Sequence, residues 1–358
     1  MSDITKIDKN FSVNADDDTD IVYYDVTKEP FEVFGVIKPA DDLDKFRRMP
    51  ADVAKGVNEG VEILHSNTAG GRIRFRTDSP YVSIKAIMPN ICRFSHLPRT
   101  GTSGFDISMV KDEKQIYLST FVPPYEMQDG YTSSHGTGEI NCETDFIINM
   151  PLYNDVSKLY IGIKKGYVLK KSVSEYEKGL PVVYYGSSIT QGGCASRPGN
   201  CYQNIISREI NRDYINLGFS GSAKAEQKMI DYIKQLDMSV FVYDYDHNAP
   251  DAEYLKKTHK HMFDEIRAAK PDLPVIMLSR PSAVVYPDTL KRLNIIKNTY
   301  ECAIKDGDKN VYMIDGGEMM RKHCGNDGTV DNTHPNDIGF AAMAKEIGSI
   351  IKKILIHN

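Results

Sequence analysis

The pattern of hydrophobic and polar positions changes near the middle of the chain and divides it into an N-terminal and a C-terminal half. From about residue 20 to residue 170, short runs alternate between apolar and polar positions, as half-buried β-strands do. The clearest runs are Val61–Leu64, Arg72–Arg76, Val82–Ile87 and Gln115–Leu118, with turn signals between them such as Thr68–Gly71, Asp78–Pro80 and Gly101–Gly104. Short strands without intervening helices predict an all-β sandwich with jelly-roll character. The one helical turn expected in this half lies within 41–52.

From Pro181 onward, buried strands alternate with helices. Strands are predicted at Val182–Tyr185, Tyr214–Phe219, Val240–Tyr245, Val275–Ser279 and Val311–Asp315, and helices at Tyr202–Asn211, Ala223–Gln235, Ala252–Ala269, Thr289–Lys305 and Asp337–Ile354. This alternation predicts a parallel sheet inside a three-layer α/β/α domain. The polar segment Leu169–Leu180 fits a linker, so the expected domains are residues 1–172 and residues 173–358.

The amino-acid composition and charge argue against several classes of protein. The chain has 358 residues, 41% of them hydrophobic and 26% charged, with a net charge of −5 and no basic stripe, which argues against a nucleic-acid partner. The first 20 residues contain no apolar signal core, and no run approaches the ~18 apolar residues of a membrane span. We therefore expect a cytoplasmic protein. The six cysteines form no C-x-x-C pair or zinc-type spacing, and we expect reduced thiols, although Cys194 and Cys201 flank one turn and could lie close together.

The candidate catalytic residues lie just after the predicted strands or before the last helix. Ser188 follows the first strand, Gly221 the second and Asn248 the third, while Asp331 and His334 precede the final helix. Because ligands bind at the carboxyl ends of parallel strands, these residues are expected to share one edge of the sheet. Their types suit acyl transfer.

In this interpretation Ser188 is the nucleophile and His334 its base, with Asp331 orienting the imidazole. The backbone N–H groups of Ser188 and Gly221 and the Asn248 side chain would hold the oxyanion.

These four blocks, in this order, resemble the SGNH (GDSL-type) hydrolase superfamily over about residues 180 to 355. The resemblance implies a flavodoxin-like catalytic domain with the roles given above. The N-terminal half, with a G-x-D motif at Gly104-Phe105-Asp106, resembles the β-sandwich that precedes this domain in one subgroup. That subgroup includes bacterial carbohydrate-type esterases and a polyketide acyltransferase. Two departures stand out: the usual G-D-S is Gly186-Ser187-Ser188, and the third block reads Asp-x-x-x-Asn.

Other interpretations of these residues stay open. Ser187 is an alternative nucleophile, and Ser188, Gly221 or the Asp331–His334 loop could serve only as helix caps or turns. A metal at Asp244, Asp246 and His247 is disfavoured because no further ligand motif follows. Arg197 either contacts substrate or forms a salt bridge. The alternating Arg72, Arg74 and Arg76 are expected to be solvated, with carbohydrate contact as the alternative, and His259 and His261 to lie on a solvated helix surface.

The function expected from sequence is therefore a serine esterase that needs no cofactor and no metal. Family resemblance suggests a short acyl ester, most simply acetyl, on a small molecule or oligosaccharide. The alternatives are an acyltransferase that uses the same residues and a non-catalytic carbohydrate-binding protein. The oligomeric state is not predicted.

Overall fold

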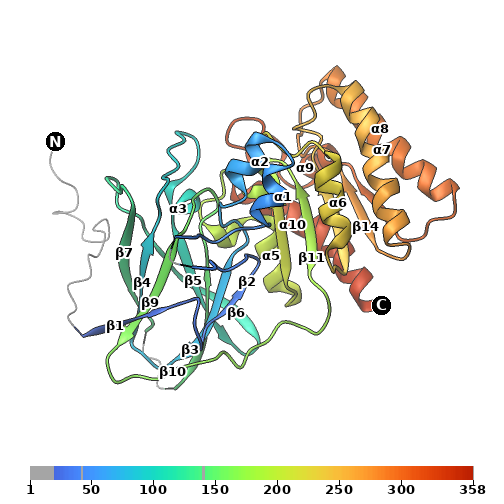
Figure 1. Ribbon diagram of the computed structural model, residues 1–358. Helices are drawn as coiled ribbons and strands as arrows, with labels where there is room; N and C mark the ends of the chain where they lie inside the picture. The colour runs from blue at the N-terminus through green and yellow to red at the C-terminus, as the bar shows by residue number, and fades with distance from the viewer. Residues whose placement is uncertain (1–19, 42, 139–141, 358) are drawn as a thin grey trace.

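Two antiparallel sheets form the N-terminal half of the molecule. The computed structural model describes residues 20–41, 43–138 and 142–357, and Figure 1 shows the two halves side by side. One sheet has the order β1 (Ile21–Asp25), β9 (Lys158–Lys164), β4 (Tyr81–Ile87), β7 (Gly130–Gly136); the other has β10 (Leu169–Lys170), β3 (Arg72–Thr77), β8 (Thr144–Asn149), β5 (Phe105–Lys111), β6 (Lys114–Phe121), with β2 (Glu32–Phe34) beside β3. Side chains from both sheets, among them Phe75, Phe146, Ile84 and Ile161, share one core. The predicted β-sandwich is confirmed.

Five parallel strands form the sheet of the C-terminal half. Their order is β12 (Tyr214–Gly218), β11 (Val182–Gly186), β13 (Val240–Asp244), β14 (Val275–Leu278), β15 (Val311–Ile314). Along β11, Val183 and Tyr185 enter one core and Val182 and Tyr184 the other, as the alternation of a strand requires. The first core is covered by α6 (Gln227–Gln235), α7 (Ala252–Ala269) and α8 (Pro287–Lys305), the second by α5 (Tyr202–Ile210), α9 (Gly316–His323) and α10 (Asp337–His357). The predicted α/β/α layering is also confirmed.

The prediction of a strand at Val61–Leu64 is wrong. This run lies in α2 (Glu59–Leu64), where the Asn58 side chain caps the helix by accepting a hydrogen bond from the Val61 N–H at 2.9 Å. The short α1 (Ala51–Lys55) precedes it, so the helical turn expected within 41–52 begins only at Ala51. Ala54 and Val61 are buried in the core of the second domain.

The expectation that the β3 arginines are solvated is wrong for two of them. Arg72 and Arg74 are each 1% exposed. Arg72 donates hydrogen bonds to Asp213 Oδ1 at 2.8 Å and to the Tyr214 carbonyl at 2.7 Å, and its guanidinium lies 3.9 Å from the Tyr214 ring centre. The second domain therefore covers Arg72 on this face of the sandwich, whereas Arg74 lines a cavity at the junction of the domains.

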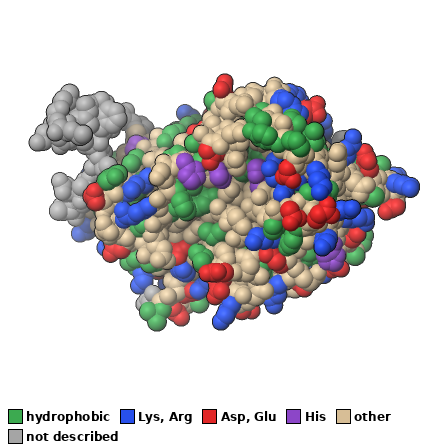
Figure 2. Space-filling view, turned by 90° about the horizontal axis from the view of Figure 1, so that it is seen from above, with side chains coloured by type: hydrophobic (Ala, Val, Ile, Leu, Met, Phe, Trp, Pro, Cys, Tyr) green, Lys and Arg blue, Asp and Glu red, His purple; other side chains and the backbone are tan. Residues whose placement is uncertain are grey.

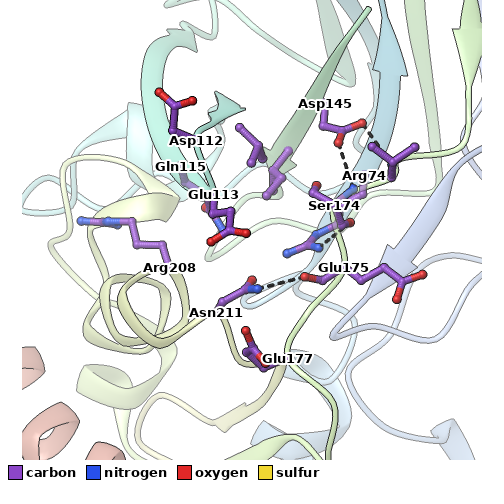
Figure 3. Close-up of a pocket in the computed structure, with 13 residues that line it drawn as sticks. Arg74, Asp112, Glu113, Gln115, Asp145, Ser174, Glu175, Glu177, Arg208 and Asn211 are labelled. Atoms are coloured by element: carbon purple, nitrogen blue, oxygen red, sulfur yellow. Dashed lines mark hydrogen bonds between the residues drawn. The ribbon is translucent and has the colours of Figure 1, made fainter.

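The segment expected to be a linker is bound to both domains. The Ser174 N–H donates to Asp145 Oδ2 at 2.9 Å, and Arg74 donates to the Ser174 carbonyl at 3.0 Å. Asn211, at the end of α5, donates to the Glu175 carbonyl at 2.9 Å. Figure 3 shows these groups around a cavity of about 490 Å³ at the junction of the domains. None of the predicted catalytic residues lines that cavity. The domain boundary after residue 172 stays a prediction.

All six cysteines are free thiols. Cys194 Sγ donates to the His96 carbonyl, whereas Cys201 Sγ donates to the Pro198 carbonyl. None of the described helices combines the length and apolar character that crossing a bilayer would require. Residues 1–19, which carry the expectation about a signal segment, lie outside the described residues.

His259 is buried, contrary to the sequence prediction, whereas His261 is exposed. The His259 ring stacks on Tyr243 with 4.8 Å between ring centres, and its Nδ1 lies 3.0 Å from Thr299 Oγ1. His259 lies on the face of α7 that contacts both the sheet and α8, and its contacts with Tyr243 and Thr299 place the ring in the core. Burial lowers the pKa of His259 to about 3.

This burial predicts a pH-dependent stability. In the unfolded chain the histidine takes up a proton below its ordinary pKa of about 6.5, whereas in the folded protein it stays neutral until about pH 3. The unfolded state therefore binds more protons in this window, and His259 alone should cost about 2 kcal/mol of unfolding free energy between pH 8 and pH 5. We expect His259→Phe to remove that loss, measured by urea unfolding at both pH values. His261→Phe is the control, and an equal pH slope in His259→Phe and wild type would contradict the assignment.

Candidate active site

The carboxyl ends of the three neighbouring strands β12, β11 and β13 converge closely. In the sheet register Gly186 at the end of β11 lies opposite Gly218 of β12 and Asp244 of β13. The Phe219 N–H donates to the Gly186 carbonyl at 2.8 Å, so the loops after the first two strands are joined. The residues that follow these strand ends therefore meet at one edge, as the strand–helix pattern predicted.

Ser188 begins a four-residue helix directly beyond β11. In α4 (Ser188–Gln191) the preceding Ser187 is the N-cap, and its buried hydroxyl accepts a hydrogen bond from the Ile189 N–H at 3.2 Å. Ser188 is half-buried, and its Oγ lies 2.9 Å from His334 Nε2. The two serines thus have different environments: Ser187 is occupied by the helix cap, and Ser188 faces the imidazole.

Asp331 holds His334 from the other side of the ring. Its Oδ2 lies 2.7 Å from His334 Nδ1, and its Oδ1 accepts hydrogen bonds from the backbone N–H groups of Thr333 at 3.1 Å and His334 at 2.7 Å. Burial by itself would raise the pKa of Asp331, but these hydrogen bonds from His334 and Thr333 lower it below its ordinary value. At neutral pH the carboxylate is therefore ionised and fixes Nδ1 as the protonated nitrogen, which leaves Nε2 free to accept a proton from Ser188.

Three hydrogen-bond donors lie along the same edge. Within the described part of the chain, neither the Ser188 N–H nor the Gly221 N–H donates a hydrogen bond. Gly221 has φ +68°, a backbone conformation that glycine adopts readily. The need for glycine at this position is compatible with a role of its N–H in binding the oxyanion. One N–H of the Asn248 amide is used by the Phe219 carbonyl at 2.9 Å, which ties the third loop to the second and leaves the other N–H free to donate.

The N-terminal domain supplies one wall of this site, which the sequence interpretation missed. The Tyr153 hydroxyl donates to the Ser188 carbonyl at 3.1 Å. The Phe94 ring contacts those of Tyr153 and His96, and the His96 ring lies 5.6 Å from that of His334. No motif marks these residues; they come from two separate segments of the sandwich, the 88–98 loop and the loop after β8, which meet only in the folded protein.

Cys194, on the loop after α4, is also close to this wall. Its Sγ donates to the His96 carbonyl at 3.4 Å, and burial, together with the nearby Asp331, raises the pKa of its thiol to about 12. In the view from above, histidine side chains gather on one face beside apolar ones (Figure 2).

A hollow of about 550 Å³ adjoins the site through Tyr153 and Phe94. Its lining mixes apolar side chains with amides and charges: Ile63, Leu64, Ile91, Cys92, Asn67, Asn90, Lys45, Glu62, Arg93 and Asp155. All of these residues belong to the N-terminal half, and Tyr153 links the hollow to the nucleophile by donating to the Ser188 carbonyl.

Arg197 is placed away from the nucleophile. Its Nη1 lies 3.3 Å from Asp106 Oδ2, and its guanidinium lies 3.9 Å from the Tyr117 ring centre. Asp106, the acidic residue of the G-x-D motif, is fully buried and also accepts from the Gly199 N–H at 2.5 Å and from Asn149 at 2.6 Å. The motif therefore fixes the loop after α4 to the sandwich, and the structure favours the salt-bridge alternative for Arg197 over substrate contact.

Asp244 and Asp246 are buried and accept hydrogen bonds from other protein groups, whereas the buried Nε2 atom of His247 has no hydrogen-bond partner among the described residues. Asp244 accepts from Thr190 at 3.2 Å, and Asp246 accepts from the Arg280 N–H at 3.1 Å. Burial, with the charges of Arg280 and His334, lowers the pKa of His247 to about 3, so it is neutral at ordinary pH.

Two family descriptions match consecutive parts of the chain. Residues 179–352 match the GDSL-like lipase/acylhydrolase family, and residues 21–169 match the N-terminus of SGNH hydrolase-type esterases. The family resemblance inferred from sequence is therefore confirmed. No curated protein sequence matches the chain at the significance applied.

Several solved structures share the fold over almost the whole chain. A putative GDSL-like lipase from Bacteroides ovatus is 27% identical, with a TM-score of 0.81 over 94% of this chain and 98% of that one. A salicylyl-acyltransferase from a tetracycline biosynthetic pathway is 17% identical, with a TM-score of 0.74 over 92% and 96%. An acetyl xylan esterase from Butyrivibrio proteoclasticus is 10% identical, with a TM-score of 0.56 over 93% and 99%. The last two likenesses concern the fold alone.

The position of Arg197 predicts a structural and not a kinetic role. We expect Arg197→Met to lower the free energy of unfolding by about 2 kcal/mol, because the buried Asp106 loses its charged partner. The KM for a neutral ester should change less than about twofold, because the guanidinium faces Asp106 and not the nucleophile. Urea unfolding and initial rates measure both quantities, with the exposed Arg321→Met as control. A raised KM at unchanged stability would return Arg197 to substrate binding.

Proposed function

The chain belongs to the GDSL-like lipase/acylhydrolase family and is a serine hydrolase; from this premise we propose that it hydrolyses short acyl esters carried by a carbohydrate. The observation that carries the proposal is the hydrogen-bonded series Ser188 Oγ, His334 Nε2, His334 Nδ1 and Asp331 Oδ2, with separations of 2.9 and 2.7 Å. A hydroxyl, an imidazole and an ionised carboxylate in this order form a nucleophile, its base and the group that orients the base.

In the proposed reaction Ser188 Oγ attacks the ester carbonyl while its proton passes to His334 Nε2. Asp331 stabilises the resulting imidazolium, and the negative oxygen of the tetrahedral intermediate accepts hydrogen bonds from the N–H groups of Ser188 and Gly221 and from the Asn248 amide. The intermediate collapses, the alcohol leaves with the proton from His334, and an acyl-serine remains. Water then attacks the acyl-serine, giving its proton to His334, and the carboxylic acid is released as Ser188 regains its hydrogen.

The carbohydrate part of the proposal is supported by the surroundings of the site and by its structural relatives. Aromatic rings beside amide and charged groups, as in the hollow next to Ser188, suit a sugar, which presents apolar ring faces and hydroxyls. Among the structures with this fold is an acetyl xylan esterase. The acyl group proposed is acetyl.

A second candidate is acyl transfer to an alcohol with the same three residues. This second candidate is supported by a salicylyl-acyltransferase that has the same fold over 92% of the chain. The two reactions differ in what attacks the acyl-serine. Product analysis in the presence of an alcohol acceptor separates them, since a transferase yields the new ester in preference to the free acid.

The different environments of the two serines predict opposite outcomes for their substitution. We expect Ser188→Ala to reduce p-nitrophenyl acetate hydrolysis at least about a thousand-fold, to the background rate. Ser187→Ala should lose about 1 kcal/mol of stability with its helix cap and keep activity within about tenfold of wild type. Initial rates and thermal unfolding of both variants are the measurement. Equal rates in Ser188→Ala and wild type would overturn the assignment of the nucleophile.

Acyl-chain length tests the proposed substrate class. We expect kcat/KM for the C2 p-nitrophenyl ester to exceed that for the C8 ester by at least about tenfold if the acyl group is acetyl, because Tyr153 lies directly beside the nucleophile. A clear preference for the C8 ester would contradict the short-acyl proposal, although it would leave the serine hydrolase assignment intact.

A further inference from the structure

Three side chains of metal-ligand type surround the outer side of the candidate active site. His96 comes from the N-terminal domain, Cys194 from the loop after α4 and His334 from the loop before α10. One potential ligand atom from each lies within 4.8 Å of the others. The sequence prediction of no metal rested on the spacing of residues along the chain. His96 and Cys194 are 98 positions apart and become neighbours only in the folded protein.

The atom that His334 can offer is defined by its existing partners. Nδ1 is held by Asp331 at 2.7 Å, so Nε2, which lies 2.9 Å from Ser188 Oγ, is the nitrogen left for a ligand. A histidine that binds a metal through one nitrogen commonly donates its other N–H to a carboxylate, which orients the ring and increases its basicity. Asp331 already occupies that supporting position.

Two imidazole nitrogens and one sulfur define the class of cation. This donor set suits Zn²⁺ and similar borderline or soft ions such as Cd²⁺ and Co²⁺, and it does not suit Mg²⁺ or Ca²⁺, which prefer oxygen. Three protein ligands leave one tetrahedral position for water or Ser188 Oγ. Binding displaces the thiol proton of Cys194, because the thiolate is the form that coordinates the metal.

We propose that Zn²⁺ or a cation of the same class binds His96, Cys194 and His334 and reversibly inhibits the enzyme by taking His334 Nε2 away from Ser188. The inhibition, though not the binding, rests on the proposed esterase function. The bound ion would also join the 88–98 loop of the sandwich to the catalytic domain. Zinc should therefore raise the midpoint of thermal unfolding as its concentration exceeds the dissociation constant.

Binding is tested first, without reference to activity. Metal-free protein is titrated with ZnCl₂ by calorimetry and with CdCl₂ while the ultraviolet charge-transfer band of a cadmium–thiolate bond is followed. We expect one site in wild type and in Ser188→Ala, at least about tenfold weaker zinc binding in His96→Ala, and loss of the cadmium band in Cys194→Ser. His261→Ala and Cys302→Ser, which lie on other surfaces, should bind as wild type does. Unchanged zinc affinity in both His96→Ala and Cys194→Ser would overturn the site.

Inhibition is tested next with p-nitrophenyl acetate. Zinc should inhibit wild type and a chelator should restore the rate, whereas His96→Ala should need at least about tenfold more zinc for half inhibition, with each rate taken relative to the same variant without zinc. Zinc binding at this site without inhibition would overturn the regulatory part of the proposal. If the zinc-free enzyme hydrolysed no ester, the proposed function would fail, and the calorimetric and cadmium results would still decide whether the cation site exists.

Discussion

The candidate site depends on one steric constraint, the absence of room for a side chain at Gly186 and Gly218. A Cβ atom at Gly186 would lie 2.4 Å from the Asp244 carbonyl oxygen, and one at Gly218 would lie 2.1 Å from the Gln191 N atom. Because these backbones touch directly, α4 begins within two residues of the end of β11 and packs onto β12. Ser187 then caps the helix, and Ser188 is held where His334 reaches it. A larger residue at either glycine would separate the strand ends and move the nucleophile from its partner.

The N-terminal sandwich contributes residues to the candidate active site and contacts the second domain directly. The buried Asp106 holds the loop after α4 through the Gly199 N–H and Arg197, and the Tyr153 hydroxyl bonds the Ser188 carbonyl. A buried carboxylate is stable only when its charge is matched by hydrogen bonds and cations. For Asp106 the cation and the Gly199 N–H come from the other domain, and Asn149 of the sandwich donates a further hydrogen bond. The two domains therefore fix each other's position at the site.

The sequence predictions were accurate where a local pattern of residues allows only one structure, and inaccurate where contacts between distant segments decide the structure. The five parallel strands were predicted correctly because each is a short, mainly apolar run that is largely buried. The helix predicted at Ala223–Gln235 begins only at Gln227. Val61–Leu64 was misassigned because four residues of alternating character do not separate a strand from a capped helix. Arg72, Arg74 and His259 were expected in solvent because their types are usually exposed; the domain junction and the α7–α8 contact bury them against tyrosine rings instead.

By itself the sequence determined the layered α/β/α fold, the sandwich before it and the order of Ser188, Gly221, Asn248, Asp331 and His334 along one sheet edge. Those features follow from local periodicity and from the rule that parallel strands end on the same side. Only the tertiary structure decided which serine faces the imidazole, that Arg197 binds Asp106, and that Tyr153, His96 and Cys194 surround the nucleophile. These are contacts between segments far apart in the chain, and their energies depend on packing and burial that no local pattern of residues records.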